Sequence, residues 1–233
     1  MPRPAASSRT RRGIVVALAI AAASLVPASA QRHEDAPSPV VQRFLDHPSE
    51  LHPYEATRHL EAESLGHSGW LDATTRYSAQ GGFSYTVTAS GGSGFINNHV
   101  LKPILQREKQ MIESGDSSQS ALDEHNYTFS AGADDADGLA TVLLQPKRRE
   151  ETLIDGAIHL HQESGRIVRL EGKLAKSPSF WIKRADIVRS YAMLGGANVP
   201  VRLETVADMR IFGKAQMRMT YVYASINGVP IAE

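Results

Sequence analysis

Two histidines and a glutamate alternate along one short segment, in a pattern that could bind a metal ion. In "AIHLHQES" (157–164), His159, His161 and Glu163 are spaced two residues apart. Alternate side chains of a strand share a face, and imidazole with carboxylate is a ligand set for zinc. One strand supplies too few ligands, and the alternative is two histidines on a solvated face near a turn. We therefore expect no metal, with these three residues as minor candidates.

Motifs for catalysis and for cofactor binding are absent from the sequence. The chain has no cysteine, and it contains neither G-x-S-x-G nor S-x-x-K. The glycine-rich "SGGSGF" (90–95) lacks the spacing of a dinucleotide loop and the GK[ST] ending of a phosphate loop. We therefore expect a protein without enzymatic activity and without a cofactor, and keep a hydrolase with an unrecognised site as an alternative.

Aromatic and methionine residues near the C-terminus form the candidate ligand site. Pro178 interrupts one strand pattern, as proline does at bulges and edges, and Phe180 and Trp181 follow it. Methionine suits both adaptable apolar surfaces and irregular cores, so core and pocket lining both remain open for these side chains. The candidates for an apolar cavity are Phe180, Trp181, Met209, Ile211, Met217, Met219, Tyr221 and Tyr223.

Period-two patterns predict the strands that would position these residues. In "VPVRLETVADMRIF" (199–212) apolar residues share one parity and charged residues the other, and "KAQMRMTYVY" (214–223) does the same. This pattern predicts a hairpin around Gly213 with one solvated face. Similar segments recur from residue 54 onward with short connections between them, which indicates about nine or ten antiparallel strands.

One segment has helical spacing instead. In "VLKPILQREKQMIES" (100–114) the apolar residues recur every three to four positions, and Pro103 places the expected start at Asn98 or His99. So many strands with so few helices predict an α+β, predominantly β fold. We expect a single curved antiparallel sheet that forms a half-open barrel, covered by one or two helices.

The N-terminal residues predict export. A basic head with Arg3, Arg9, Arg11 and Arg12 precedes the apolar run "GIVVALAIAAASLV" (13–26) and the small residues of "PASA" (27–30). These features predict a secretory signal over residues 1–30, cleaved after Ala30, and a periplasmic protein. Residues 31–52 then form a flexible leader with a possible short helix, and 53–230 form one β-rich domain.

The charge balance narrows the range of partners. The chain has 25 basic and 25 acidic residues, and removing the four arginines of the signal leaves 21 against 25, a formal charge of −4. No dense basic stretch predicts nucleic-acid binding, and no second apolar run has the length of a transmembrane segment. Without disulfides, packing must hold the exported protein together.

Several stretches resemble a family of exported bacterial proteins. They are "GWLDATTRYSAQGGFSYTVTASGGSGFINNHVL" (69–101), "NYTF" (126–129), "LLQPKR" (143–148), "DGAIHL" (155–160), "EGKLAKSPSFW" (171–181) and "MTYVYASING" (219–228). Uncharacterised proteins with such stretches look similar to the outer-membrane lipoprotein-sorting (LolA-like) family. The resemblance covers residues 54 to 228 and implies an unclosed antiparallel barrel, lidded by helices, that holds acyl chains.

These observations together predict a binding or carrier protein. The expected ligand is a lipid, an acyl chain or a lipidated protein held in an apolar cavity, with lipoproteins or envelope proteins as further partners. The main alternative is a structural or protein-interaction module of the envelope whose cavity is filled by its own side chains.

Overall fold

The structure is a computed structural model that describes residues 38–47, 51–133, 137–180, 182–211 and 213–232. The chain divides into two compact units, Met1–Asp35 and Ala36–Glu233. All described residues belong to the second unit, and the predicted signal lies outside them. No helix in the described part of the chain is long and apolar enough to cross a membrane.

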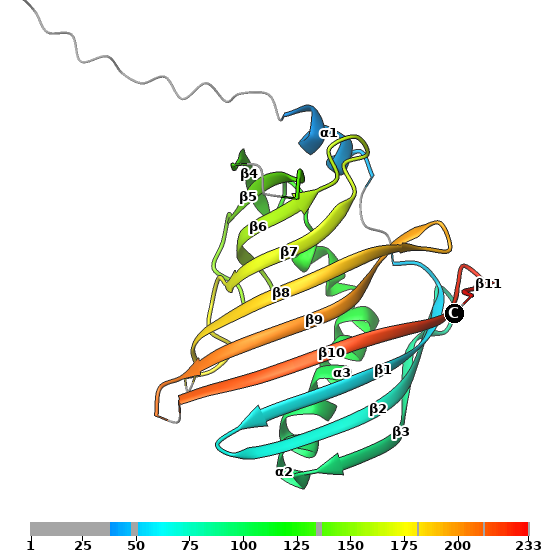
Figure 1. Cartoon of the computed structure of the whole chain (residues 1–233), viewed down its shortest axis with the longest axis vertical. Helices are drawn as coiled ribbons and strands as arrows, with labels where there is room; N and C mark the ends of the chain where they lie inside the picture. The colour runs from blue at the N-terminus through cyan, green and yellow to red at the C-terminus, as the bar shows by residue number, and fades with distance from the viewer. Residues whose placement is uncertain (1–37, 48–50, 134–136, 181, 212, 233) are drawn as a thin grey trace, which may run out of the picture. The chain divides into compact units, whose positions relative to one another are not determined.

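One antiparallel sheet organises the second unit (Figure 1). Along the sheet the strands run β3-β2-β1-β10-β9-β8-β7-β6-β5-β4, and the short β11 pairs with β10, which gives 11 strands among the described residues. Their bounds in chain order are β1 Tyr54–Ser64, β2 His67–Ser78, β3 Gly82–Gly92, β4 Tyr127–Ala131, β5 Ala140–Pro146, β6 Ile154–Leu160, β7 Ile167–Leu174, β8 Ile182–Leu194, β9 Ala197–Met209, β10 Gly213–Ile226 and β11 Val229–Pro230.

The prediction of a single open antiparallel sheet is therefore confirmed. The predicted hairpin around Gly213 is β9–β10, where Met209 pairs with Gly213 and Leu203 with Met219. Gly213 has a φ of 80°, a left-handed conformation that favours glycine and that this tight turn requires. The pairing of β1 with β10 is not sequential. It joins the hairpins of the N-terminal strands to the C-terminal strands.

A continuous helical segment from Gly94 to Glu113 packs on one face of the sheet, which we call the inner face (Figure 1). It consists of α2 (Gly94–Ile96), a π-helical turn (Asn97–Leu101) and α3 (Lys102–Glu113). The helix begins before the predicted start at Asn98 or His99. That prediction placed Pro103 in the first turn, whereas the π turn shifts the hydrogen-bond ladder just before the proline, which lacks an N–H.

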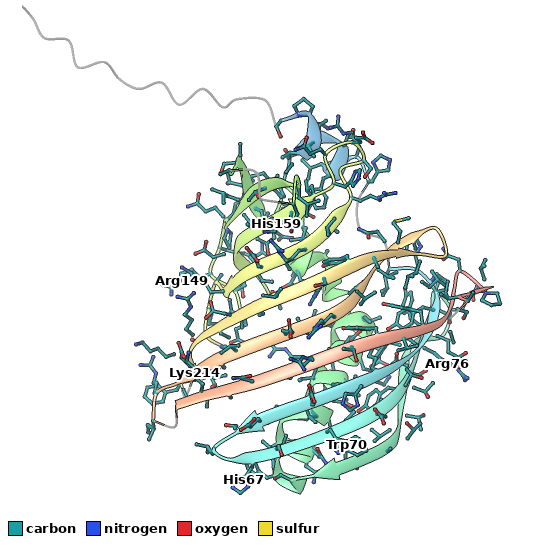
Figure 2. The ribbon with its side chains drawn as sticks, in the orientation of Figure 1. His67, Trp70, Arg76, Arg149, His159 and Lys214 are labelled. Atoms are coloured by element: carbon teal, nitrogen blue, oxygen red, sulfur yellow. The ribbon has the colours of Figure 1, made fainter. Side chains whose placement is uncertain are left out.

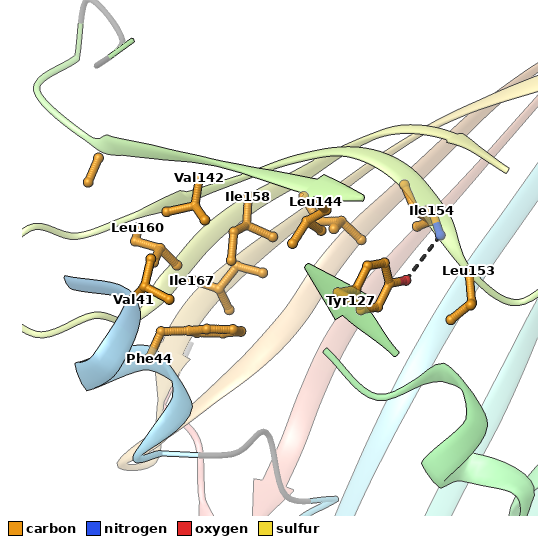
Figure 3. Close-up of a cluster of buried hydrophobic side chains, with 12 residues drawn as sticks. Val41, Phe44, Tyr127, Val142, Leu144, Leu153, Ile154, Ile158, Leu160 and Ile167 are labelled. Carbon is orange, nitrogen blue, oxygen red and sulfur yellow. Dashed lines mark hydrogen bonds between the residues drawn. The ribbon is translucent and has the colours of Figure 1, made fainter. Parts of the chain in front are cut away.

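The inner face carries a first core at the β4–β7 side of the sheet (Figure 3). Helix α1 (Pro39–Leu45) lies in the predicted leader and contributes Val41 and Phe44, each at most 5% exposed. Tyr127 is also buried, and its hydroxyl accepts a hydrogen bond from the Ile154 N–H at 3.0 Å. This part of the leader is therefore a packed element.

A second and a third core lie at the other side of the sheet. In the second, Leu60, Leu71 and Met219 of the sheet pack against Ile96, Leu101 and Leu105 of the helical segment, and none of the six is more than 2% exposed. The third surrounds Ala197, Tyr223 and Ile226, near the β8–β9 turn. Side chains therefore fill the space between this part of the sheet and the helix.

Candidate functional site

Few residues in the middle of the sheet are fully buried. Strands β8 and β9 lie at the centre of the strand order, yet Ala185 is the one buried residue on β8. On β9 the buried residues are Ala197, Val199 and Ala207, towards the two ends of the strand. A half-buried strip lies between the three cores, formed by Ile187, Arg189, Tyr191, Val201, Leu203, Thr205, Met217 and Tyr221.

Strand pairing places these side chains on one face. Leu203 pairs with Arg189 on one side and with Met219 on the other, and Thr205 pairs with Ile187 and Met217. Directly paired residues of antiparallel strands project to the same side of a sheet. Since Met219 belongs to the core under the helix, the whole strip belongs to the inner face.

Arg189 is the charged group of this strip. Its Nε is buried and has no hydrogen-bond partner. Burial opposes its charge, but Tyr191, Tyr221 and Glu108 outweigh that effect and raise the pKa of Arg189, so the guanidinium stays protonated. An apolar strip with a cation that has unused donor capacity suits a ligand with an apolar body and an acidic group.

A second arginine, Arg58 of β1, joins the sheet to the helix. It is 2% exposed, and its guanidinium donates to both carboxylate oxygens of Glu108 on α3, at 2.5 and 2.9 Å. It also donates to the Tyr54 hydroxyl at 2.5 Å and lies over the rings of Phe83 and Tyr221, at 5.3 and 4.7 Å from their centroids. Burial disfavours its charge, but the Glu108 carboxylate overcomes this and raises the pKa of Arg58.

The tyrosines around Arg58 remain protonated well above neutral pH. Burial is the main cause, and it raises the pKa of Tyr54 to about 12 and also raises the pKa values of Tyr221 and Tyr223. The Tyr221 and Tyr223 rings stack at 6.2 Å, and the Tyr223 hydroxyl donates to the Pro200 carbonyl at 2.9 Å. Tyr54 also lines a hollow of about 340 Å³ at the end of the strands, with Tyr77 and Arg76.

The predicted cavity residues do not all lie in one place. Met219 and Tyr223 are buried in the cores, and Met217 and Tyr221 belong to the half-buried strip. Met209 is half-buried at the end of β9, whereas Phe180 and Ile211 are 72% and 64% exposed in turns. Trp181 lies outside the described residues. The structure therefore brings the β10 residues together and places Phe180 and Ile211 away from them.

The histidine pattern does not assemble into one site. His159 is 4% exposed on β6, where its ring contacts Glu171 at 3.2 Å and Thr141 at 3.3 Å (Figure 2). His161 and Glu163 follow the end of β6 and are exposed. Of the two histidines expected on a solvated face, His159 is instead covered by its cross-strand neighbours. Within the described residues, no three His, Cys, Asp or Glu side chains are grouped to hold a metal.

The sequence reading missed Arg58, Glu108 and Arg189. Two of these residues could have been found from the sequence, because each is a charged residue at a position of a strand where the alternating residues are apolar. Arg58 alternates with Tyr54, Ala56 and Leu60, and Arg189 alternates with Ile187 and Tyr191. A charge on the apolar side of a predicted strand indicates a buried ion pair or a binding group.

Comparisons with known proteins add little to these observations. No family model matches the chain, and no curated protein matches it significantly. Among solved structures, a DUF1329 family protein from Desulfovibrio piger is similar over 78% of this chain and 88% of that chain, at 8% sequence identity and a TM-score of 0.38. A likeness this low carries no argument about function, so the fold is established by the strand pairing of the chain itself.

Proposed function

We propose that this protein is a periplasmic, non-enzymatic binding protein that holds an acyl chain on the inner face of its sheet. The observation that supports this proposal is the half-buried apolar strip on β8, β9 and β10. In a sheet whose inner face is filled by its own side chains, the centre is the most buried part. Here the two central strands carry mostly half-buried side chains, as expected of a surface that a ligand covers.

Burial of apolar surface supplies the binding free energy. Each methylene removed from water contributes about 0.8 kcal/mol, so an acyl chain laid along the strip gains several kcal/mol after its ordering cost. Leu203 and Ile187 provide aliphatic contact, and Met217 adapts to chains of different shape. Arg189 lies between them and favours a ligand with a carboxylate or phosphate end.

Two tryptophan substitutions on β9 test the location of this site. Leu203 faces the inner strip, whereas Val206 lies on the outer face, 36% exposed. We expect Leu203→Trp to fill part of the strip and to weaken binding of a fluorescent fatty acid about tenfold or more. The control Val206→Trp should bind like the wild type, and the methyl ester of the probe should bind the wild type more weakly than the acid, because it cannot pair with Arg189.

The result also separates this proposal from the alternative of an envelope module with a filled core. Wild-type protein that fails to bind the probe would support the module. Equal loss of binding in both variants would place the site elsewhere. Thermal unfolding of each variant, followed by circular dichroism, checks that both variants fold like the wild type.

A further inference from the structure

Two neighbouring turns at one end of the sheet combine exposed apolar side chains with basic ones. The first turn joins β7 to β8 and contains Phe180, and the second joins β9 to β10 and contains Ile211. These residues are 72% and 64% exposed, among the highest values for large apolar side chains in the described part of the chain. Exposed apolar side chains that lie close together are candidates for a contact surface.

Direct contacts hold the two turns together. The Arg210 guanidinium lies over the Phe180 ring, 5.1 Å from its centroid. The Arg210 Nε also donates to the Phe180 carbonyl at 2.6 Å. Strand pairing continues this link, since Ile182 at the start of β8 pairs with Met209 at the end of β9. The turns that carry Phe180 and Ile211 therefore contact each other directly.

The turns are basic. Residues 175–183 and 209–214 contain Lys176, Lys183, Arg210 and Lys214 and no acidic residue. Lys183, Arg210 and Lys214 are exposed, and within the described residues none of the three forms an ion pair. Of the nearby acids, Asp186 on β8 pairs with Arg184 at 2.5 Å, and Glu150 and Glu151 in the β5–β6 loop lie 3.9 Å from Arg148 and 3.7 Å from Lys176. Asp208 lies opposite Lys214 in the β9–β10 ladder without forming an ion pair with it.

Other basic residues face the same end. Arg149 lies in the β5–β6 loop and donates to the Ala175 carbonyl of the β7–β8 turn at 3.5 Å. Figure 2 shows Arg149 and Lys214 at the same edge of the sheet, both pointing away from it. In antiparallel order the β5–β6, β7–β8 and β9–β10 connections all lie at one end of their strands.

We infer that this basic end, with Phe180 and Ile211 at its tip, docks on the surface of an anionic lipid bilayer. Apolar and aromatic side chains insert at the level of the headgroups, and lysine and arginine beside them are attracted to anionic lipids. A protein partner with an acidic, apolar surface would need a matched shape, whereas two turns with exposed apolar and basic side chains fit a planar, deformable surface. This inference stands independently of the ligand on the inner face.

Flotation of the purified protein with vesicles tests the inference. Wild-type protein should float with vesicles of phosphatidylcholine and phosphatidylglycerol, and should bind vesicles of phosphatidylcholine alone much more weakly. Binding should also fall as salt is added. Phe180→Ser with Ile211→Ser should lower binding about tenfold or more, and Lys183→Ala with Lys214→Ala about tenfold.

Matched controls show whether the effect belongs to this end of the sheet. Val222 is 64% exposed, the same as Ile211, but lies within β10 on the outer face, so Val222→Ser should bind like the wild type. Arg166→Ala, in the β6–β7 turn at the opposite end, should also retain binding. Wild-type protein that floats with neither vesicle would overturn the inference, as would controls that lose as much binding as the paired variants.

Discussion

Arg58 and Glu108 form the ion pair in which a single substitution should cost most. Removing one partner of a buried pair leaves the other charge uncompensated and destabilises a fold by about 3–5 kcal/mol. Glu108 is 31% exposed, so water screens part of this effect. We expect Glu108→Gln to lower the free energy of unfolding by about 2–3 kcal/mol, measured by urea denaturation.

An exposed pair provides the control for that measurement. Glu55 and Arg76 are 2.8 Å apart, with 39% and 65% of their side chains exposed. Exposed pairs contribute about 0–1 kcal/mol, so Glu55→Gln should change stability little. If the two variants lost similar free energies of unfolding, the burial of the Arg58–Glu108 pair would not add to its contribution to stability.

The tyrosines beside Arg58 predict a loss of stability at alkaline pH. The pKa of Tyr54 is raised from 10.0 to about 12, so folding favours its neutral form. Its contribution is fully present below pH 10 and is lost as the pH rises through about 12. Tyr54→Phe should therefore unfold with a weaker dependence on pH in this window, as followed by circular dichroism. An unchanged pH profile would contradict the burial of this hydroxyl.

At the scale of elements, two glycines facing each other allow β6 and β7 to approach closely. Gly156 pairs with Gly172, and a Cβ added to Gly156 would lie 2.0 Å from the Glu171 carbonyl oxygen. We expect Gly156→Ala to lower the free energy of unfolding by about 3 kcal/mol, because the backbone must shift. Gly94→Ala, which meets nothing within 4 Å, is the control and should change stability by less than about 1 kcal/mol. Equal thermal stability of the two variants would contradict the close approach.

Elements of this kind were predictable to different degrees. Alternation of apolar and charged residues predicts β9, β10 and the hairpin at Gly213, because one face of these strands is packed and the other is solvated. The helix start was not predictable, since the π turn before Pro103 depends on packing of Ile96 and Leu101 against the sheet. The tight pairing of Gly156 with Gly172 likewise depends on contacts between strands, which spacing alone does not encode.

The candidate site was predictable only in part, for the same reason. Met217 and Tyr221 share a parity, and the structure places both on the inner strip. Phe180 and Ile211 are also large apolar residues next to predicted strands, but they are exposed because they lie in turns at the end of the sheet. The half-buried strip combines residues of β8, β9 and β10, so it depends on the strand order rather than on any one segment.

At the scale of the whole molecule, three separate cores border a half-buried strip in the middle of the sheet. We propose that an acyl chain covers this strip. The most direct measurement is organic extraction and mass spectrometry of the protein purified from its native cells without detergent. We expect a fatty acid or lipid in stoichiometric amount, reduced in Leu203→Trp and retained in Val206→Trp. A lipid-free wild-type protein that also takes up no fluorescent fatty acid would contradict it.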